Sequence, residues 1–207
     1  MKKILLIITL VALSFSVYAV NDHYNKKMKE YASSLIEDQG LDNNKELVYN
    51  FKRLVKTYPD EWEAKYYVAY CLYRNSYLDQ ENAEYNIAEA LDFLDSIDGE
   101  LFKGHADFLI LKARILFTVL GMDNSQGEKL MPQISSLLNI ALEMEPNNSR
   151  GLLVLGQYYY YLPSFIGGDK AKGIDKFKLA YENYVKEAGS ELPKWPESIY
   201  TYSINLK

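Results

Sequence analysis

Apolar residues recur at intervals of three and four positions along almost the whole chain, the spacing that places them on one face of an α-helix. Alternating apolar and polar runs joined by Asn-Gly or Asp-Gly turns, which mark β-hairpins, are nearly absent. Only 6 Pro and 11 Gly interrupt the 207 residues. The pattern therefore predicts an all-α domain of about eight full helices, the first of them around residues 24–36. A short additional helix is expected to begin at Pro196. The apolar steps that mark the helices between them include Leu47, Phe51 and Leu54; Val68 and Leu72; Ile87, Leu91 and Leu94; Leu109, Ala113 and Leu116; Ile134, Leu138 and Ala141; Leu152, Leu155 and Tyr159; and Ile174, Phe177 and Ala180.

The first 19 residues have the layout of a secretory signal peptide. Lys2 and Lys3 form a charged start, residues 4–17 are apolar, and Val17-Tyr18-Ala19 fits a cleavage site, although Val17 is larger than the usual Ala. The apolar stretch is shorter than the roughly 20 residues that cross a bilayer. We therefore expect a periplasmic or secreted protein that begins at Val20 after cleavage and does not span a membrane.

The single cysteine, Cys71, cannot form an internal disulfide. It lies far from the predicted cleavage site, where a lipid-anchored protein would need one. Because it falls within the apolar stretch 68–72, we expect a packed and unreactive thiol.

Charge and motif content exclude several classes of function. The net charge is −5 and the lysines alternate with acids rather than forming a basic stripe, so nucleic acid is not an expected partner. With only His23 and His105, the chain cannot build a multi-histidine metal site. Nucleophile-elbow, phosphate-loop and dinucleotide motifs are absent; Gly167-Gly168 lacks the Lys-Ser/Thr ending of a phosphate loop and is expected to be a turn. We predict a non-catalytic protein with no cofactor and no resident metal.

One stretch carries a recognisable repeat pattern. Leu152-x2-Leu155-Gly156-x2-Tyr159, followed by Gly173-x3-Phe177-x2-Ala180, resembles the tetratricopeptide repeat. The closing positions of earlier copies match at Leu138, Ala141 and Pro146 and at Leu47, Phe51, Leu54 and Pro59. The match is strong over residues 145–184 and weak before Pro59. Residues 121–195 also resemble exported bacterial tetratricopeptide proteins with a Pro-x3-Gly-Gly loop.

The resemblance implies one superhelical solenoid over residues 20–207. Small residues such as Gly156 would allow neighbouring helices to approach closely, and Pro59 and Pro146 would end the second helix of a repeat. These prolines lie 87 residues apart, whereas two repeats of about 34 residues would give about 68. We expect the surplus in loops at 75–86, 96–105 and 121–133.

In tetratricopeptide proteins the first helix of each repeat builds an inner, concave wall. Stepping around those helices gives a face rich in tyrosine, of which the chain has 19. An aromatic face with a few charges suits a peptide or an amphipathic helix, although tyrosine also serves as half-buried packing. The residues predicted to line this partner-binding groove are Tyr66, Tyr70, Tyr73, Arg74, Asp107, Arg114, Phe117, Arg150, Gln157, Tyr160 and Tyr161.

Three functions fit these features. The first is an exported, non-catalytic scaffold that binds a protein or peptide in the groove. The second is a binding protein for a small apolar ligand, accessory to an envelope transporter, which the loop 162–168 suggests because Phe165 and Ile166 follow four tyrosines. The third is one segment of a larger assembly, in which Trp195 to Lys207 form half a repeat that docks on a partner.

Overall fold

A computed structural model of the protein describes residues 22–187 and 195–206, and every regular element within them is helical. The predicted signal peptide lies outside these residues. A first helix covers residues 22–37. The elements that follow are α2 (Leu41–Thr57), α3 (Trp62–Leu78), α4 (Ala83–Asp95), α5 (Gly99–Lys103), α6 (Ala106–Met122), α7 (Gly127–Met144), α8 (Ser149–Tyr161), α9 (Lys170–Lys186) and α10 (Glu197–Ile204), with short 3-10 turns at Gln80–Asn82, Asn124–Gln126 and Ser164–Ile166.

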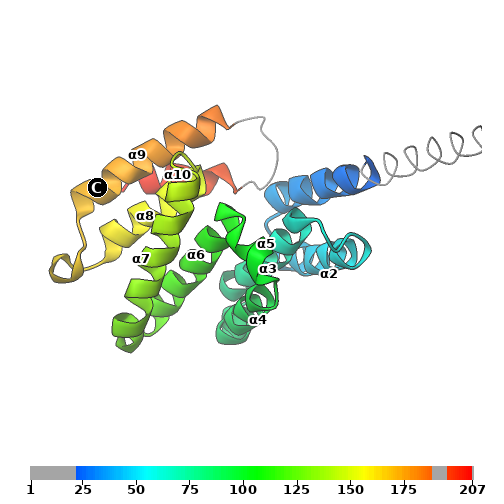
Figure 1. The fold of residues 1–207 in the computed structure, drawn as a ribbon, viewed down its shortest axis with the longest axis horizontal. Coiled ribbons are helices and arrows are strands. Elements are labelled where there is room, and N and C mark those ends of the chain that lie inside the picture. The colour runs from blue at the N-terminus through cyan, green and yellow to red at the C-terminus, as the bar shows by residue number, and fades with distance from the viewer. Residues whose placement is uncertain (1–21, 188–194, 207) are drawn as a thin grey trace, which may run out of the picture.

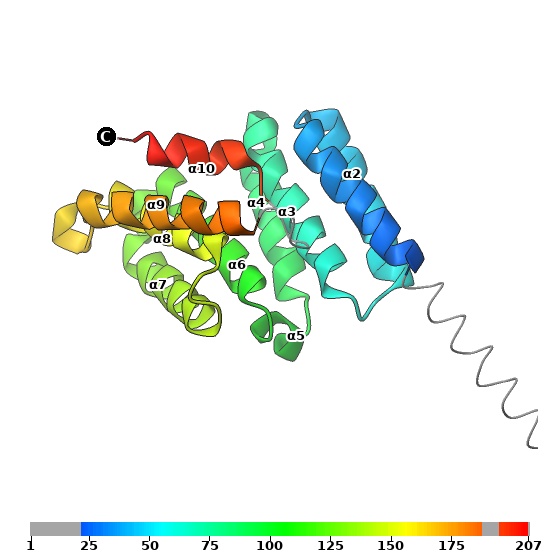
Figure 2. The same cartoon turned by 90° about the horizontal axis from the view of Figure 1, so that it is seen from above.

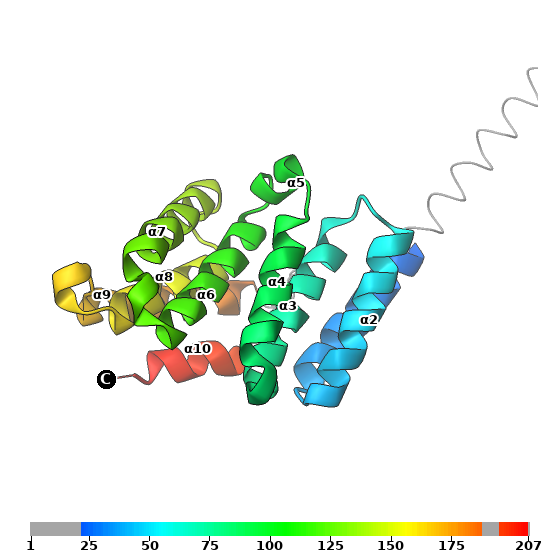
Figure 3. The same cartoon turned by 90° about the horizontal axis from the view of Figure 1, so that it is seen from below.

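Successive helices pack as pairs, α3 with α4, α6 with α7 and α8 with α9, and the pairs lie side by side in a superhelical stack (Figures 1 and 3). The prediction of an all-α superhelix is confirmed. α3, α6 and α8 contact one another in sequence order and form one face of the stack. We call it the α3–α6–α8 face. None of the helices in the described ranges is long and apolar enough to cross a membrane.

α10 departs from this stacking order. It packs on α9, and Figure 2 shows it (red) folded back across the stack, with its start beside α3. The end of the chain is thereby brought back to a helix more than a hundred positions earlier in the sequence.

The predicted loops were placed only partly correctly. α3 continues to Leu78 and α7 begins at Gly127 and passes through Pro132, so much of 75–86 and 121–133 is helical. Within 96–105 the short helix α5 forms, begun by Asp98, whose carboxylate accepts from the backbone amides of Glu100 and Leu101. The surplus residues therefore lengthen helices, because polar residues typical of turns also suit exposed helical turns and caps.

Two helices end just before the prolines that were predicted to end them. α2 ends at Thr57, two residues before Pro59, and α7 ends at Met144, two residues before Pro146. Asn148 then begins α8, where its side-chain oxygen accepts from two amides of the first turn.

Gly156 lies where α8 meets α9. A Cβ on this residue would lie 2.6 Å from the Phe177 ring and 3.1 Å from the carbonyl oxygen of Gly173. Real Cβ atoms do not approach other atoms this closely, so only glycine allows the two helices to pack at this distance. The predicted close approach is confirmed.

The Pro-x3-Gly-Gly loop is a tight turn, as predicted. Gly167 has a φ of 99°, a left-handed conformation that favours glycine. A Cβ on Gly168 would lie 1.8 Å from the carbonyl oxygen of Leu162. Both glycines are therefore needed for the chain to reverse between α8 and α9.

Cys71 is completely buried in α3. Burial raises the pKa of its thiol to about 12 because the thiolate loses its hydration.

We predict that Gly156→Ala lowers the free energy of unfolding by about 1–3 kcal/mol, because the new methyl group overpacks the α8–α9 contact. Urea denaturation followed by circular dichroism measures this. Gly121→Ala is the matched control: no atom lies within 4 Å of its Cβ position. There, alanine should stabilise the helix by roughly 0.5–1 kcal/mol. Equal effects at both positions would contradict the close-packing account.

We further predict that Cys71 does not react with a disulfide reagent at pH 8 in the folded protein, since the thiolate fraction is negligible and the thiol is covered. Labelling should begin with global unfolding as urea is raised. Fast stoichiometric labelling without denaturant would show that α3 is exposed.

Candidate functional site

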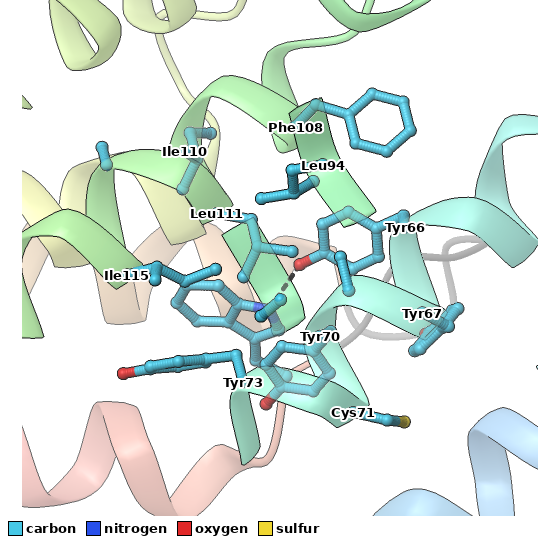
Figure 4. Packing of buried hydrophobic residues seen from close by; sticks show 14 of the residues in the cluster. Tyr66, Tyr67, Tyr70, Cys71, Tyr73, Leu94, Phe108, Ile110, Leu111 and Ile115 are labelled. Atoms are coloured by element: carbon cyan, nitrogen blue, oxygen red, sulfur yellow. Dashed lines mark hydrogen bonds between the residues drawn. The ribbon is translucent and has the colours of Figure 1, made fainter. Parts of the chain in front are cut away.

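Trp195 lies in the middle of the predicted groove. Only 1% of its surface is exposed, and its indole Nε1 donates to the Tyr66 hydroxyl over 2.6 Å. Figure 4 shows this bond as the dashed line reaching Tyr66. The groove is therefore occupied by a side chain of the same protein.

The indole is flanked by flat groups from two helices. Its ring is nearly parallel to that of Tyr70, with an angle of 7° and centroids 5.8 Å apart. The Arg114 guanidinium lies 4.8 Å from the centre of the indole and 5.9 Å from that of Tyr73. We call this site the Trp195 slot: Tyr66, Tyr70 and Arg114 contact the ring, and Tyr73 and Gln157 contact Arg114.

Arg114 has polar and aromatic neighbours but no counter-charge. Its Nη1 donates to the Gln157 side-chain oxygen over 3.1 Å. It forms no ion pair with any residue in the described ranges, although it is only half-exposed. A partly desolvated cation of this kind favours a nearby carboxylate.

Tyr70 also has an unmet polar group. The residue is 1% exposed, and its hydroxyl has no hydrogen-bond partner among the described residues. Burial raises its pKa well above the usual value, so the hydroxyl keeps its proton. A buried polar group without a partner costs about 1–3 kcal/mol. By contrast, the Tyr73 hydroxyl pairs with Thr118 Oγ1 at 2.9 Å.

Asp107 and Arg150 form a buried ion pair. Arg150 Nε donates to Asp107 Oδ1 over 2.6 Å, and Arg150 Nη1 reaches Glu187 over 3.3 Å. Burial by itself would lower the pKa of Arg150, but the charge of Asp107, its hydrogen bond and the neighbouring tyrosines together outweigh burial, so the pKa is raised. Both partners satisfy each other, so this pair ties α6 to α8 and does not present a free charge.

Arg74 does not face the predicted groove. Its guanidinium donates to the carbonyl oxygens of Leu35 over 3.1 Å and Gln39 over 3.5 Å, at the end of the first helix. Helix ends leave such carbonyls without intrahelical partners, which explains why the side chain points there.

The three remaining predicted residues lie away from the indole. Phe117 is half-buried against Tyr158, and Tyr160 packs on Phe177 of α9. Tyr161 is 52% exposed at the end of α8. The structure thus brings together five of the predicted residues in the slot and assigns the others to packing or to the surface; their predicted role in partner binding remains a prediction.

A second hollow, which the sequence analysis did not predict, lies between α2 and α4. It measures about 280 Å³, and the exposed rings of Tyr49 and Tyr85 line it. Its two lysines already have partners, since Lys45 pairs with Asp79 and Lys52 with Glu89, both at 3.2 Å. The lining of this cleft is mixed polar and apolar, and the charges of its two lysines are compensated.

The sequence analysis missed the place of Trp195, although it marked Trp195 to Lys207 as a docking segment. Within the described part of this segment, Trp195 docks on α3 and α6 of the same protein, and α10 packs on α9. The sequence contained one indication of this contact: Trp195 is a large aromatic residue next to Pro196 and lies outside any amphipathic helix.

No protein-family model and no curated protein sequence matches the chain. Among solved structures, the chain is similar to the HusA haemophore from Porphyromonas gingivalis, with a TM-score of 0.74 and 22% identity over 87% of this chain and 90% of that one. At this identity the similarity shows a shared fold. In residues 22–187 and 195–206, no group of His, Cys, Asp or Glu is arranged to hold a metal ion.

We predict that Asp107→Asn lowers the free energy of unfolding by about 3–5 kcal/mol, because it leaves Arg150 buried without its main counter-charge. Thermal denaturation should show a large drop in Tm. Glu89→Gln, which breaks the exposed pair with Lys52, serves as the control and should have a far smaller effect. Similar losses in both variants would contradict the assignment of Asp107–Arg150 as a structural pair.

Proposed function

We propose that the protein is a non-catalytic binding protein that captures a small planar ligand at the α3–α6–α8 face, with haem as the first candidate. The shared fold with a haemophore supports this, as does the signal peptide predicted from the sequence, because a haem-capturing protein must meet its ligand outside the cytoplasm. The proposal brings forward the small-ligand function that the sequence analysis ranked second.

A single observation carries the proposal: the Trp195 slot holds a flat aromatic ring beside a guanidinium that has no carboxylate partner within residues 22–187 and 195–206. Haem is a flat apolar ring system with two carboxylate side chains. Tyr70 and Tyr73 offer ring faces to such a molecule, and Arg114 offers the charge.

The cleft between α2 and α4 fits this ligand less well. A carboxylate entering there would have to displace Asp79 from Lys45 or Glu89 from Lys52. We therefore assign the ligand to the slot.

Titration of the purified protein with haem, followed by visible absorbance, tests the proposal. We expect saturation at one haem per chain. Arg114→Gln should weaken binding about tenfold or more, the loss of one charged hydrogen bond. Lys52→Gln, which removes a cation from the other cleft, should bind like the parent. Absence of saturable binding, or equal affinity in the parent and in Arg114→Gln, would contradict the proposal.

A peptide or protein segment is the second candidate ligand, as the sequence analysis first proposed. It is favoured because the slot already accommodates Trp195 from a short extended segment of the chain, which continues into the helix α10 packed on α9. A partner captured by the parent protein and lost with Arg114→Gln would support this function. A partner retained equally by both would place its binding surface outside the slot.

A further inference from the structure

We infer that Trp195 is a built-in occupant of the slot, and that the slot is a binding site for a planar aromatic group bearing a carboxylate, which replaces the indole when it binds. This inference rests on the proposed function, because it concerns the same slot. It identifies both the chemistry of the ligand and the group that the ligand must displace.

An unpaired hydroxyl on Tyr70 and an uncompensated charge on Arg114 show that the indole is an imperfect occupant. An indole has a single donor and no acceptor in its ring plane, and Trp195 uses that donor on Tyr66. It therefore has nothing to offer the Tyr70 hydroxyl and no charge to offer Arg114. A residue that served only to fill the core would gain by having these groups satisfied or replaced with apolar ones.

The two unmet groups define the ligand. A planar aromatic face would stack where the indole now stacks on Tyr70. A carboxylate would pair with Arg114. An oxygen or nitrogen acceptor of the ligand would accept a hydrogen bond from the Tyr70 hydroxyl. A porphyrin carries this chemistry, and so does an aromatic residue at the C-terminus of a peptide.

The segment that holds Trp195 has anchors outside the slot. The Tyr200 ring stacks on Tyr184 with centroids 4.5 Å apart, and its hydroxyl lies 3.2 Å from Ser149 Oγ. Glu197 accepts a hydrogen bond from Tyr181 over 3.3 Å. Removing the indole alone therefore leaves α10 attached to α8 and α9, so Trp195→Ala can empty the slot without unfolding the segment.

Competition predicts the size of the effect. If only a fraction f of the molecules has an open slot, the apparent dissociation constant of the ligand is larger than the intrinsic one by a factor of 1/f. A buried indole that stacks, donates a hydrogen bond and lies under a guanidinium should keep f at about 0.1 or below. Trp195→Ala should therefore bind its ligand at least about tenfold more tightly than the parent.

The experiment compares the parent, Trp195→Ala and Trp62→Phe by isothermal titration with three probes: protoporphyrin IX, its dimethyl ester, and the dipeptide Gly-Trp. Trp62→Phe is the control because Trp62 stacks on His105 and meets the slot only in an edge contact with Tyr66, so it tests whether loss of any tryptophan changes affinity. Circular dichroism checks that all three proteins are folded. We expect tighter binding in Trp195→Ala alone, and weaker binding of the ester than of the free acid.

Each outcome separates the two proposals. Equal affinity of the parent and Trp195→Ala would overturn the exchange with Trp195 and leave a ligand-binding function at another surface. An ester that binds as tightly as the acid would overturn the pairing with Arg114. Binding of Gly-Trp without protoporphyrin would support the slot and reject haem. Failure of all three probes with both proteins would overturn the inference and the proposed function together.

Discussion

The contact between Trp195 and the α3–α6–α8 face determines which surfaces of this protein are open. A stack of helix pairs buries the faces between neighbouring pairs but leaves the inner side of the stack uncovered. Here the chain returns after α9 and covers part of that side itself, by inserting one indole among residues of α3 and α6. Tyr66 and Tyr70, which contact the indole, are among the most buried aromatic residues, at 0% and 1% exposure.

Two arginines on neighbouring helices differ in whether an acidic side chain compensates their charge. Arg150 is surrounded by Asp107 and Glu187, so its charge is satisfied within the fold. Arg114 has an amide and two aromatic rings around it but no acid among the residues that the structure describes. The charge of Arg150 is compensated within the fold, whereas that of Arg114 is available to a negative group of a ligand. This asymmetry is the reason to assign binding to the slot rather than to the ion-paired cleft between α2 and α4.

The helices and their close contacts could be predicted from the sequence because they depend on residues near one another in the chain. Steps of three and four give the apolar faces, Pro59 and Pro146 end their helices, and Gly156 permits the approach of α9. The same stepping predicted that Tyr66, Tyr70 and Tyr73 share one face of α3, and all three belong to the slot. It failed for Arg74, because two neighbouring positions on a helix can serve different partners, and this one caps the first helix. It could not place Trp195, because the contact with Tyr66 spans 129 positions and no local pattern records it.

The account depends on Trp195 being held in the slot in solution, and hydrogen exchange at its indole nitrogen tests this most directly. The chain has 2 tryptophans, so NMR of the 15N-labelled protein should give two indole signals, which Trp62→Phe assigns. We expect the Trp195 signal to exchange many times more slowly than a free indole, since its proton is buried and bonded to Tyr66. Exchange at the rate of free indole would show that the segment is not docked, and would contradict the self-occupied slot on which both proposals depend.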